Sequence, residues 1–271
     1  MPAQPELIIQ ASAESLATDV AVRVMSTLAR AQQVRGRAAL ALTAGSIMEQ
    51  VWSAMAATPS RESVDWSRVD VFWADERYVP ADSPDRNDGP ANRLLFSHPP
   101  FKDARLFPMP ASDGPFANLD DAAAGYAEQL SAARRSDDPD ELPHFDVLLL
   151  GVGPDGHCAS LFPEHPSAYD ESGPVIAVRN SPKPPPLRIS LSFAGLAAAN
   201  EIWFVASGAG KARAVALALS GAGRVQVPSA GPRGRFRTLW LVDRDAAAGL
   251  PRHPTAARSS DRWAGRHSST G

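Results

Sequence analysis

The sequence predicts an α/β protein with a Rossmann-like, open, mainly parallel sheet and helices on both faces. Short apolar runs of strand length alternate with amphipathic helical stretches along most of the 271 residues. Polar, glycine-rich and titratable residues gather just after the predicted strands, and ligands bind at that edge of such sheets. Hydrophobic residues make up 44% of the chain, as is ordinary for a globular protein.

The first half of the chain supplies three predicted strands and four predicted helices. Residues 7–9 form a short opening strand, and Ser12 is expected to cap the helix that follows, in which apolar residues recur at helical spacing. The apolar run 38–43, bounded by turn residues, predicts a buried strand, and an amphipathic helix follows it. The next strand is expected at 69–73, a short helix near 91–95 and a longer helix at 119–135.

The second half continues the alternation and then loses it. Residues 136–143 are a surface connection, and 145–150 form the clearest buried strand. Further strands are expected at 175–178, 188–193, 202–206 and 238–242, with a helix at about 210–219. Near residue 249 the pattern fails. We therefore expect a single domain over residues 1–250 and a disordered tail over 251–271.

Charge and cysteine content exclude several classes of partner. A net charge of −3 and a pI near 6.1 leave no basic stripe for nucleic acid and no polybasic membrane anchor. Cys158 is the only cysteine, so an intramolecular disulfide is impossible. The first ten residues lack a secretory signal, and no apolar run approaches the ~18 residues of a spanning helix. A cytoplasmic protein without a membrane partner is expected.

Residues 151–156 match the dinucleotide fingerprint G-x-G-x-x-G, but their surroundings argue against a nucleotide cofactor. That motif opens a sizeable helix and has an acidic residue about 20 positions later. Here His157 follows at once, Pro163 limits any helix, and the expected acidic position falls near Ile176. Residues 208–211 are not a phosphate-binding Walker loop, which would need glycine at Val205.

Residues 146–163, DVLLLGVGPDGHCASLFP, resemble the signature of the 6-phosphogluconolactonases, a family grouped with the glucosamine-6-phosphate deaminases. The resemblance continues at 71–77, 85–88, 181–188, 208–211 and 240–248, and spans about 7–250. It implies hydrolysis of a phosphorylated sugar lactone in the oxidative pentose phosphate pathway, with no cofactor and no metal. The histidines also lack metal-ligand spacing such as H-E-x-x-H. The expected partner is this small molecule, and the expected state a monomer or small homo-oligomer.

Opening a lactone requires an activated water, a stabilised oxyanion and a proton for the leaving ring oxygen. His157 matches the family's general base and is the candidate for both proton transfers. Asp155 is expected to orient it, or else to serve only as a turn residue that binds backbone amides. Arg77 is expected to steady the oxyanion or the phosphate, or else to pair at the surface with Asp75 or Glu76.

The phosphate is expected to meet backbone amides of Gly45 and Ser46 at a helix start, together with Lys211 and Arg188. A lysine in the first turn of a helix opposes the dipole, which suggests that Lys211 serves a ligand rather than solvent.

Two further expectations concern neighbouring segments. Asp75, at the end of a predicted strand, is expected to bind substrate. The stiff segment 181–186, SPKPPP, is expected to position Lys183 or Arg188.

The chain departs from the family pattern at two places. The family's first loop usually reads SGGSTP, whereas residues 43–48 read TAGSIM, so Ala44 could obstruct a phosphate if it needs positive φ, and Ile47 lacks a hydroxyl. Cys158 stands where the family commonly has threonine. Because adjacent residues do not normally point at one another, a packing role for Cys158 is favoured over that of a nucleophile.

Two other functions compete with lactone hydrolysis. Deamination of an amino-sugar phosphate needs further acid/base carboxylates, whereas CASLFP follows residues 155–157 as in the lactonases. A non-catalytic sugar-phosphate sensor would predict a DNA-binding appendage or loss of His157. No helix-turn-helix precedes residue 7, and the histidine is present.

Overall fold

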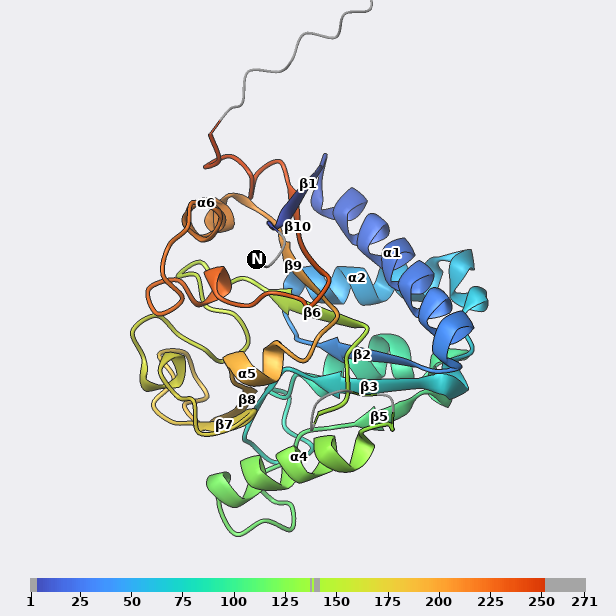
Figure 1. Cartoon of the computed structure of the whole chain (residues 1–271), viewed down its shortest axis with the longest axis vertical. Coiled ribbons are helices and arrows are strands. Elements are labelled where there is room, and N and C mark those ends of the chain that lie inside the picture. Colours follow the sequence, from blue (N-terminus) through green and yellow to red (C-terminus); the bar gives the residue numbers. More distant parts are fainter. Residues whose placement is uncertain (1–3, 137, 139–141, 252–271) are drawn as a thin grey trace, which may run out of the picture.

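The computed structural model describes residues 4–136, 138 and 142–251, and these form two sheets (Figure 1). The main sheet is parallel throughout, in the order β1 (Glu6–Gln10), β10 (Arg237–Asp243), β9 (Glu201–Ala206), β6 (Val147–Gly151), β2 (Ala38–Leu42), β3 (Val69–Trp73) and β5 (Arg105–Phe107). The small sheet is antiparallel, in the order β4 (Asp75–Arg77), β8 (Arg188–Leu191) and β7 (Val175–Val178). The predicted open, mainly parallel sheet is confirmed.

Helices flank the main sheet. The connections after β1 and β2 run toward the β5 edge and contain α1 (Ala13–Arg35) and α2 (Ser46–Ala57), which pack together. The connections after β5, β6 and β9 run the opposite way and contain α4 (Leu119–Ala133), α5 (Phe193–Leu196) and α6 (Ala212–Leu219). Because such crossovers are right-handed, the two sets cover opposite faces, and Figure 1 shows α4 across the sheet from α1 and α2.

The remaining helical segments are short. They are η1 (Pro59–Ser63), η2 (Trp66–Arg68), α3 (Asp88–Ala91), η3 (Asn92–Phe96), η4 (Phe101–Asp103), η5 (Pro166–Ala168), η6 (Ala209–Lys211) and η7 (Pro228–Ala230). All of these are single turns of 3-10 helix except α3 and the π-helical η3.

Local chemistry accounts for the elements that the sequence predicted. Strands β2, β3 and β9 are buried at every position, as expected of short apolar runs in a sheet that is covered on both faces. Helix α1 begins where expected, because the Ser12 side chain accepts a hydrogen bond from the backbone N–H of Ser15 and the serine hydroxyl of Ser15 accepts one in return. It ends at Gly36, whose φ of 76° suits glycine.

The small sheet is the main difference from the prediction. Residues 75–77 were not predicted as a strand, but they form β4, which pairs with β8. The strands expected at 175–178 and 188–193 join this antiparallel sheet instead of the parallel one, and β8 ends at Leu191 because Ser192 caps α5. Strand β5 was not predicted, since it has three residues and begins with Arg105.

Other boundaries shift slightly or cannot be compared. Helix α4 ends at Ala133 rather than at residue 135. Much of the predicted connection 136–143 and nearly all of the predicted tail 251–271 lie outside the described residues. The single-domain assignment stays a prediction.

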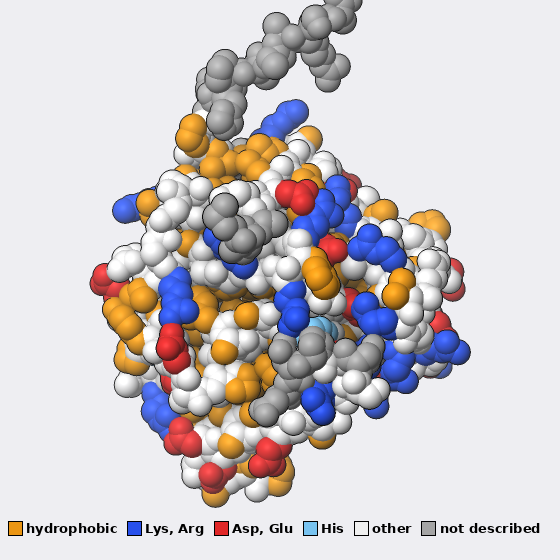
Figure 2. Space-filling model, in the orientation of Figure 1, with side chains coloured by type: hydrophobic (Ala, Val, Ile, Leu, Met, Phe, Trp, Pro, Cys, Tyr) orange, Lys and Arg blue, Asp and Glu red, His pale blue; other side chains and the backbone are white. Residues whose placement is uncertain are grey.

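The surface matches the weak net charge. On the face in Figure 2, basic and acidic side chains are interspersed, and several acidic side chains lie at the lower end, where α4 lies. Within residues 4–136, 138 and 142–251, no helix is long and apolar enough to cross a membrane.

Candidate active site

A cavity of about 330 Å³ opens at the carboxyl ends of three neighbouring strands, β9, β6 and β2. Connections from β2 run toward one edge of the sheet and those from β6 toward the other, so the chain leaves a crevice between them. Crevices at such switch points are the usual ligand sites of open α/β sheets. The small sheet closes the side of the cavity near β4 and β8.

The predicted site residues come together here. All of them except Asp155 line the cavity: Gly45, Ser46, Asp75, Arg77, His157, Arg188 and Lys211. Asp155 stands behind His157, in contact with its imidazole.

His157 and Asp155 are held together by a short hydrogen bond. The Nδ1 atom of His157 lies 2.6 Å from Oδ1 of Asp155. Because an ionised carboxylate only accepts, this partner assigns the proton to Nδ1 and leaves Nε2 as the basic nitrogen. The backbone N–H of His157 also donates to Asp155 Oδ1, at 3.4 Å, so Asp155 supports the turn as well as the ring.

Lys183 completes this cluster. Its Nζ forms an ion pair with Asp155 Oδ1, at 3.6 Å, and lies 3.2 Å from His157 Nδ1, which as an N–H makes no hydrogen bond with this second donor. Partial burial would raise the pKa of Asp155, but the hydrogen bond from His157 and attraction to His157 and Lys183 outweigh it. The pKa of this carboxyl therefore lies well below its usual range. Asp155 is thus an ionised partner for both neighbours at neutral pH.

The turn after β6 brings His157 back over Gly153. The backbone N–H of Gly153 donates to the carbonyl of His157, at 2.8 Å. Gly156 completes the turn with a φ of 89°. Two glycines of the nucleotide-like fingerprint thus build a tight turn that presents an imidazole.

Helix α2 begins at one end of the cavity. Gly45 is its N-cap, with a φ of 140°, and no side chain of the described residues caps the helix. The φ of Ala44 is not positive, so its methyl group causes no backbone strain. Ile47 packs into the core with only 9% exposure. The altered first loop therefore keeps its turn at Gly45.

Lys211 reaches the same end of the cavity from η6. Burial, followed by the nearby charge of Lys183, lowers the pKa of Lys211, and Asp155 opposes this shift. The loop before it is fixed by Asp243, whose carboxylate accepts hydrogen bonds from the Ser207 hydroxyl at 2.5 Å and the Gly208 N–H at 3.0 Å. A half-buried cation beside unpaired helix-start amides suits an anion.

The small sheet supplies Asp75 and Arg77. The Asp75 carboxylate is buried and accepts a hydrogen bond from the Ser160 hydroxyl, at 2.7 Å. Arg77 donates from Nη1 to the carbonyl of Asp85, at 2.6 Å. Among the described residues, Arg77 makes no ion pair with Asp75 or Glu76, so the predicted surface pairing does not form.

Arg188 is 4% exposed, and its guanidinium is hydrogen-bonded to the proline segment. Its guanidinium donates to the carbonyls of Lys183, Pro184 and Pro185, at 3.0 to 3.2 Å. The charges that act on Arg188 are those of Asp75, Arg77 and Glu76, whereas those that act on Lys211 are Lys183 and Asp155. The two cations expected to share a phosphate therefore stand in different electrostatic surroundings.

Sequence reasoning left some lining residues unassigned. Lys183 was expected only as one of the two residues, with Arg188, that the proline segment positions. Thr43, Asn87 and Ser207 also line the cavity. Ser207 directly follows β9 and could have been found by the rule that led to Lys211, but Asn87 follows no strand of the main sheet.

Cys158 is fully buried, and burial followed by the nearby charge of Asp75 raises the pKa of its thiol. It does not line the cavity, in agreement with the packing role favoured from the sequence. Within the described ranges, no group of three or more His, Cys, Asp or Glu side chains could hold a metal ion.

Comparison with known proteins identifies relatives of this chain. Residues 11–240 match the family described as glucosamine-6-phosphate isomerases/6-phosphogluconolactonase. The chain is 47% identical to the 6-phosphogluconolactonase of Streptomyces coelicolor, over 92% of this chain and 95% of that protein. It is 45% identical to that of Mycobacterium tuberculosis, over 84% and 92%. The structure of the Trypanosoma brucei 6-phosphogluconolactonase superposes with a TM-score of 0.77 at 26% identity, covering 92% of this chain and 99% of the other.

Proposed function

Because the chain belongs to the glucosamine-6-phosphate isomerase/6-phosphogluconolactonase family, we propose that its cavity binds 6-phosphoglucono-1,5-lactone and hydrolyses it to 6-phosphogluconate. The high identity to 6-phosphogluconolactonases over most of both chains makes it an enzyme of this kind. The observation that carries the mechanism is the His157–Asp155 pair beside a cavity whose far end is cationic.

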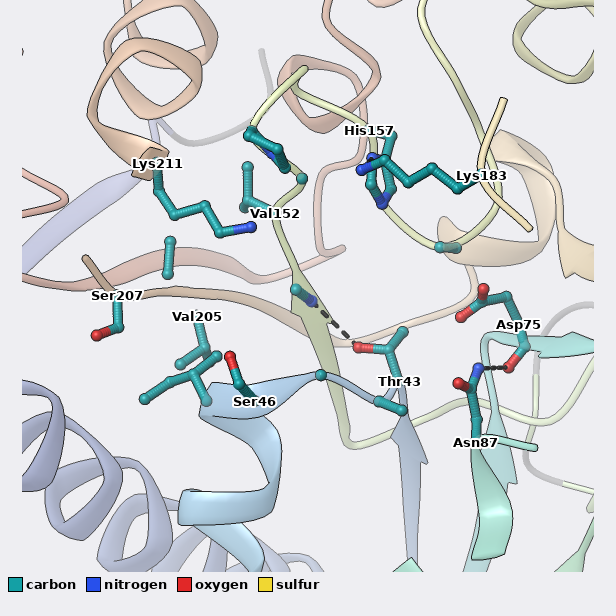
Figure 3. Close-up of a pocket in the computed structure, with 18 of the residues that line it drawn as sticks. Thr43, Ser46, Asp75, Asn87, Val152, His157, Lys183, Val205, Ser207 and Lys211 are labelled. Atoms are coloured by element: carbon teal, nitrogen blue, oxygen red, sulfur yellow. Dashed lines mark hydrogen bonds between the residues drawn. The ribbon is translucent and has the colours of Figure 1, made fainter. Parts of the chain in front are cut away.

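The phosphate binds at the start of α2. The backbone N–H groups of Gly45 and Ser46 lie at the helix start, where N–H groups have no hydrogen-bond partner within the helix, so they can donate to a phosphate. Lys211 supplies a positive charge from the opposite loop. Figure 3 shows Ser46, Ser207 and Lys211 on one side of the cavity and His157 and Asp75 on the other. The phosphate at the first side then places the lactone ring at the second.

His157 acts as the general base. Its Nε2 takes a proton from a water as the water oxygen bonds to the lactone carbonyl carbon, and a tetrahedral oxyanion forms. When the bond from this carbon to the ring oxygen breaks, the imidazolium returns the proton to that oxygen, and the open acid leaves. Asp155 holds Nδ1–H throughout and stabilises the imidazolium, because its carboxylate stays ionised.

Arg77 stabilises the oxyanion. Its guanidinium lines the cavity on the small-sheet side, and Nε is buried without a hydrogen-bond partner among the described residues. A donor preset toward developing charge lowers the barrier, because it needs no reorganisation during the reaction. Asp75, on the neighbouring wall, binds a substrate hydroxyl, and Arg188 keeps the proline segment and Lys183 in place.

The test is hydrolysis of 6-phosphogluconolactone generated in situ, measured above the spontaneous rate and in the presence of EDTA. We expect acceleration that persists in EDTA and a fall in kcat of about 10²- to 10⁴-fold in His157→Ala. His98→Ala, which alters an exposed histidine outside the cavity, is the matched control. Full activity of His157→Ala would refute the general-base role. A folded protein that binds 6-phosphogluconate without accelerating hydrolysis would favour the sensor alternative.

A further inference from the structure

Asn87 is a buried side chain held firmly at the wall of the cavity. It is 3% exposed and stands just before α3. Its side-chain Nδ2 donates to the backbone carbonyl of Asp75 at 2.9 Å, and its backbone N–H donates to Oε1 of Glu76 at 2.6 Å. The other Glu76 oxygen accepts from the backbone N–H of Asp88, at 3.0 Å. Asn87 is thus tied to β4 through both its main chain and its amide.

Among the described residues, the side-chain oxygen of this amide has no partner. Oδ1 of Asn87 is a buried atom without a hydrogen bond to any described residue, although Asn87 lines the cavity. The amide cannot be flipped, because a carbonyl oxygen facing the Asp75 carbonyl would be two acceptors in contact. A buried acceptor left unpaired is unfavourable, and such groups in native proteins usually await a ligand or water.

The position of Asn87 suggests what its ligand is. Figure 3 places Asn87 beside Asp75, across Thr43 from Ser46 and Lys211. A phosphate is disfavoured directly beside Asn87, because Oδ1 can only accept and the neighbouring Asp75 is a carboxylate. Two adjacent acceptors instead suit hydroxyl groups, which can donate to them. The Nε of Arg77, also buried and without a partner in the described part of the chain, could donate to an oxygen of the same ligand.

We propose that Oδ1 of Asn87 accepts a hydrogen bond from one ring hydroxyl of the bound sugar lactone, which makes Asn87 a specificity-determining residue. The inference rests on the proposed function. Because Asn87 is fixed by β4 before substrate arrives, it selects for a hydroxyl at one ring position. A sugar that lacks this hydroxyl would leave the acceptor unpaired in the complex, and this is how buried polar groups reject deoxy analogues.

The test compares 6-phosphogluconolactone with its 2-, 3- and 4-deoxy analogues in the full-length protein. We expect the unaltered enzyme to lose about tenfold or more in kcat/KM for one of these analogues, as for one lost hydrogen bond. In Asn87→Ala the parent lactone should lose a similar factor while that analogue is turned over as before, so the ratio of the two kcat/KM values approaches one. Asn87→Ser serves the same comparison if the alanine variant does not fold.

The ratio separates recognition from a structural role. If Asn87 only supported the fold, its replacement would lower kcat/KM for all four lactones by the same factor, and the proposal would be wrong. It would also be wrong if the unaltered enzyme hydrolysed every deoxy lactone as fast as the parent, an outcome that leaves the proposed function intact. Failure to hydrolyse the parent lactone at all would instead overturn the proposed function and this inference with it.

Discussion

The turn that presents His157 has no room for a side chain at Gly153. A Cβ there would lie 1.9 Å from His157 Nδ1 and 2.4 Å from Asp155 Oδ1, so both groups would have to move. We expect Gly153→Ala to lower kcat by about 10²-fold or more, since small displacements of catalytic groups have effects of this size. Steady-state kinetics alongside thermal unfolding would show whether activity falls further than stability.

The matched control is Gly173→Ala, in a loop outside the cavity. The nearest atom to its added Cβ is a carbonyl oxygen at 4.0 Å, and its φ is not positive. It should leave kcat unchanged. Equal kinetic losses in the two variants would mean that the steric argument at Gly153 is mistaken.

The low pKa of Asp155 predicts how its contribution to stability depends on pH. A carboxyl whose folded pKa is depressed stabilises the fold in full above its unfolded pKa, about 3.9, and loses that contribution as pH falls toward the folded value. The stability difference between the unaltered protein and Asp155→Asn should therefore be larger at pH 6 than at pH 3. Its size should stay below about 1 kcal/mol, because the side chain is 36% exposed.

Chemical unfolding of both proteins at the two pH values provides the measurement. Asp103→Asn, which removes an exposed carboxylate outside the cavity, supplies the baseline for any general charge effect. A difference that grew on acidification would contradict the sign of the shift.

At the scale of elements, the start of α2 depends on one backbone conformation. Gly45 has a φ of 140°, which side-chain-bearing residues rarely adopt, although the space around it is open. Gly45→Ala should lower the free energy of unfolding by about 1–2 kcal/mol and weaken 6-phosphogluconate binding, because strain would shift the helix-start amides. Denaturant unfolding and calorimetric titration measure the two effects.

Gly89→Ala makes the opposite prediction for stability and so controls for the mutation type. Gly89 lies in α3, its φ is not positive, and no atom lies within 4 Å of an added Cβ. Alanine there should raise stability by about 0.5 kcal/mol, because it restricts the unfolded chain. If both variants were stabilised, strain at Gly45 would be excluded.

The elements also mark where sequence reasoning works and where it ends. Buried parallel strands such as β2 and β9 can be predicted from the sequence, because burial on both faces produces continuous apolar runs. Strand β4 contains only Asp75, Glu76 and Arg77, so its composition gives no strand signal. It forms because β8 offers a pairing edge, which is a tertiary cause.

The same division runs through the candidate site. His157, Ser46 and Lys211 follow strands of the main sheet, and the rule that ligands lie beyond carboxyl ends was enough to select them. Lys183 and Asn87 reach the cavity through long connections, and their contacts with His157 and Asp75 depend on how the small sheet packs. Such contacts cannot be predicted from the spacing of residues along the chain.

At the scale of the whole molecule, the cavity lies at the seam between the two sheets. The groups proposed for phosphate binding and proton transfer come from the main sheet, while Asp75, Arg77 and Asn87 come from β4 and the segment after it. The residues that hold the phosphate, which every sugar phosphate has, therefore lie in different segments of the chain from those that face the variable ring.

This separation has a consequence for how such an enzyme can diversify. A lineage that keeps Arg77 could exchange the rest of residues 75–88 and so acquire a new ring preference, while its phosphate-binding and proton-transfer groups descend unchanged. An engineer could do the same by transplanting that one short segment from a relative.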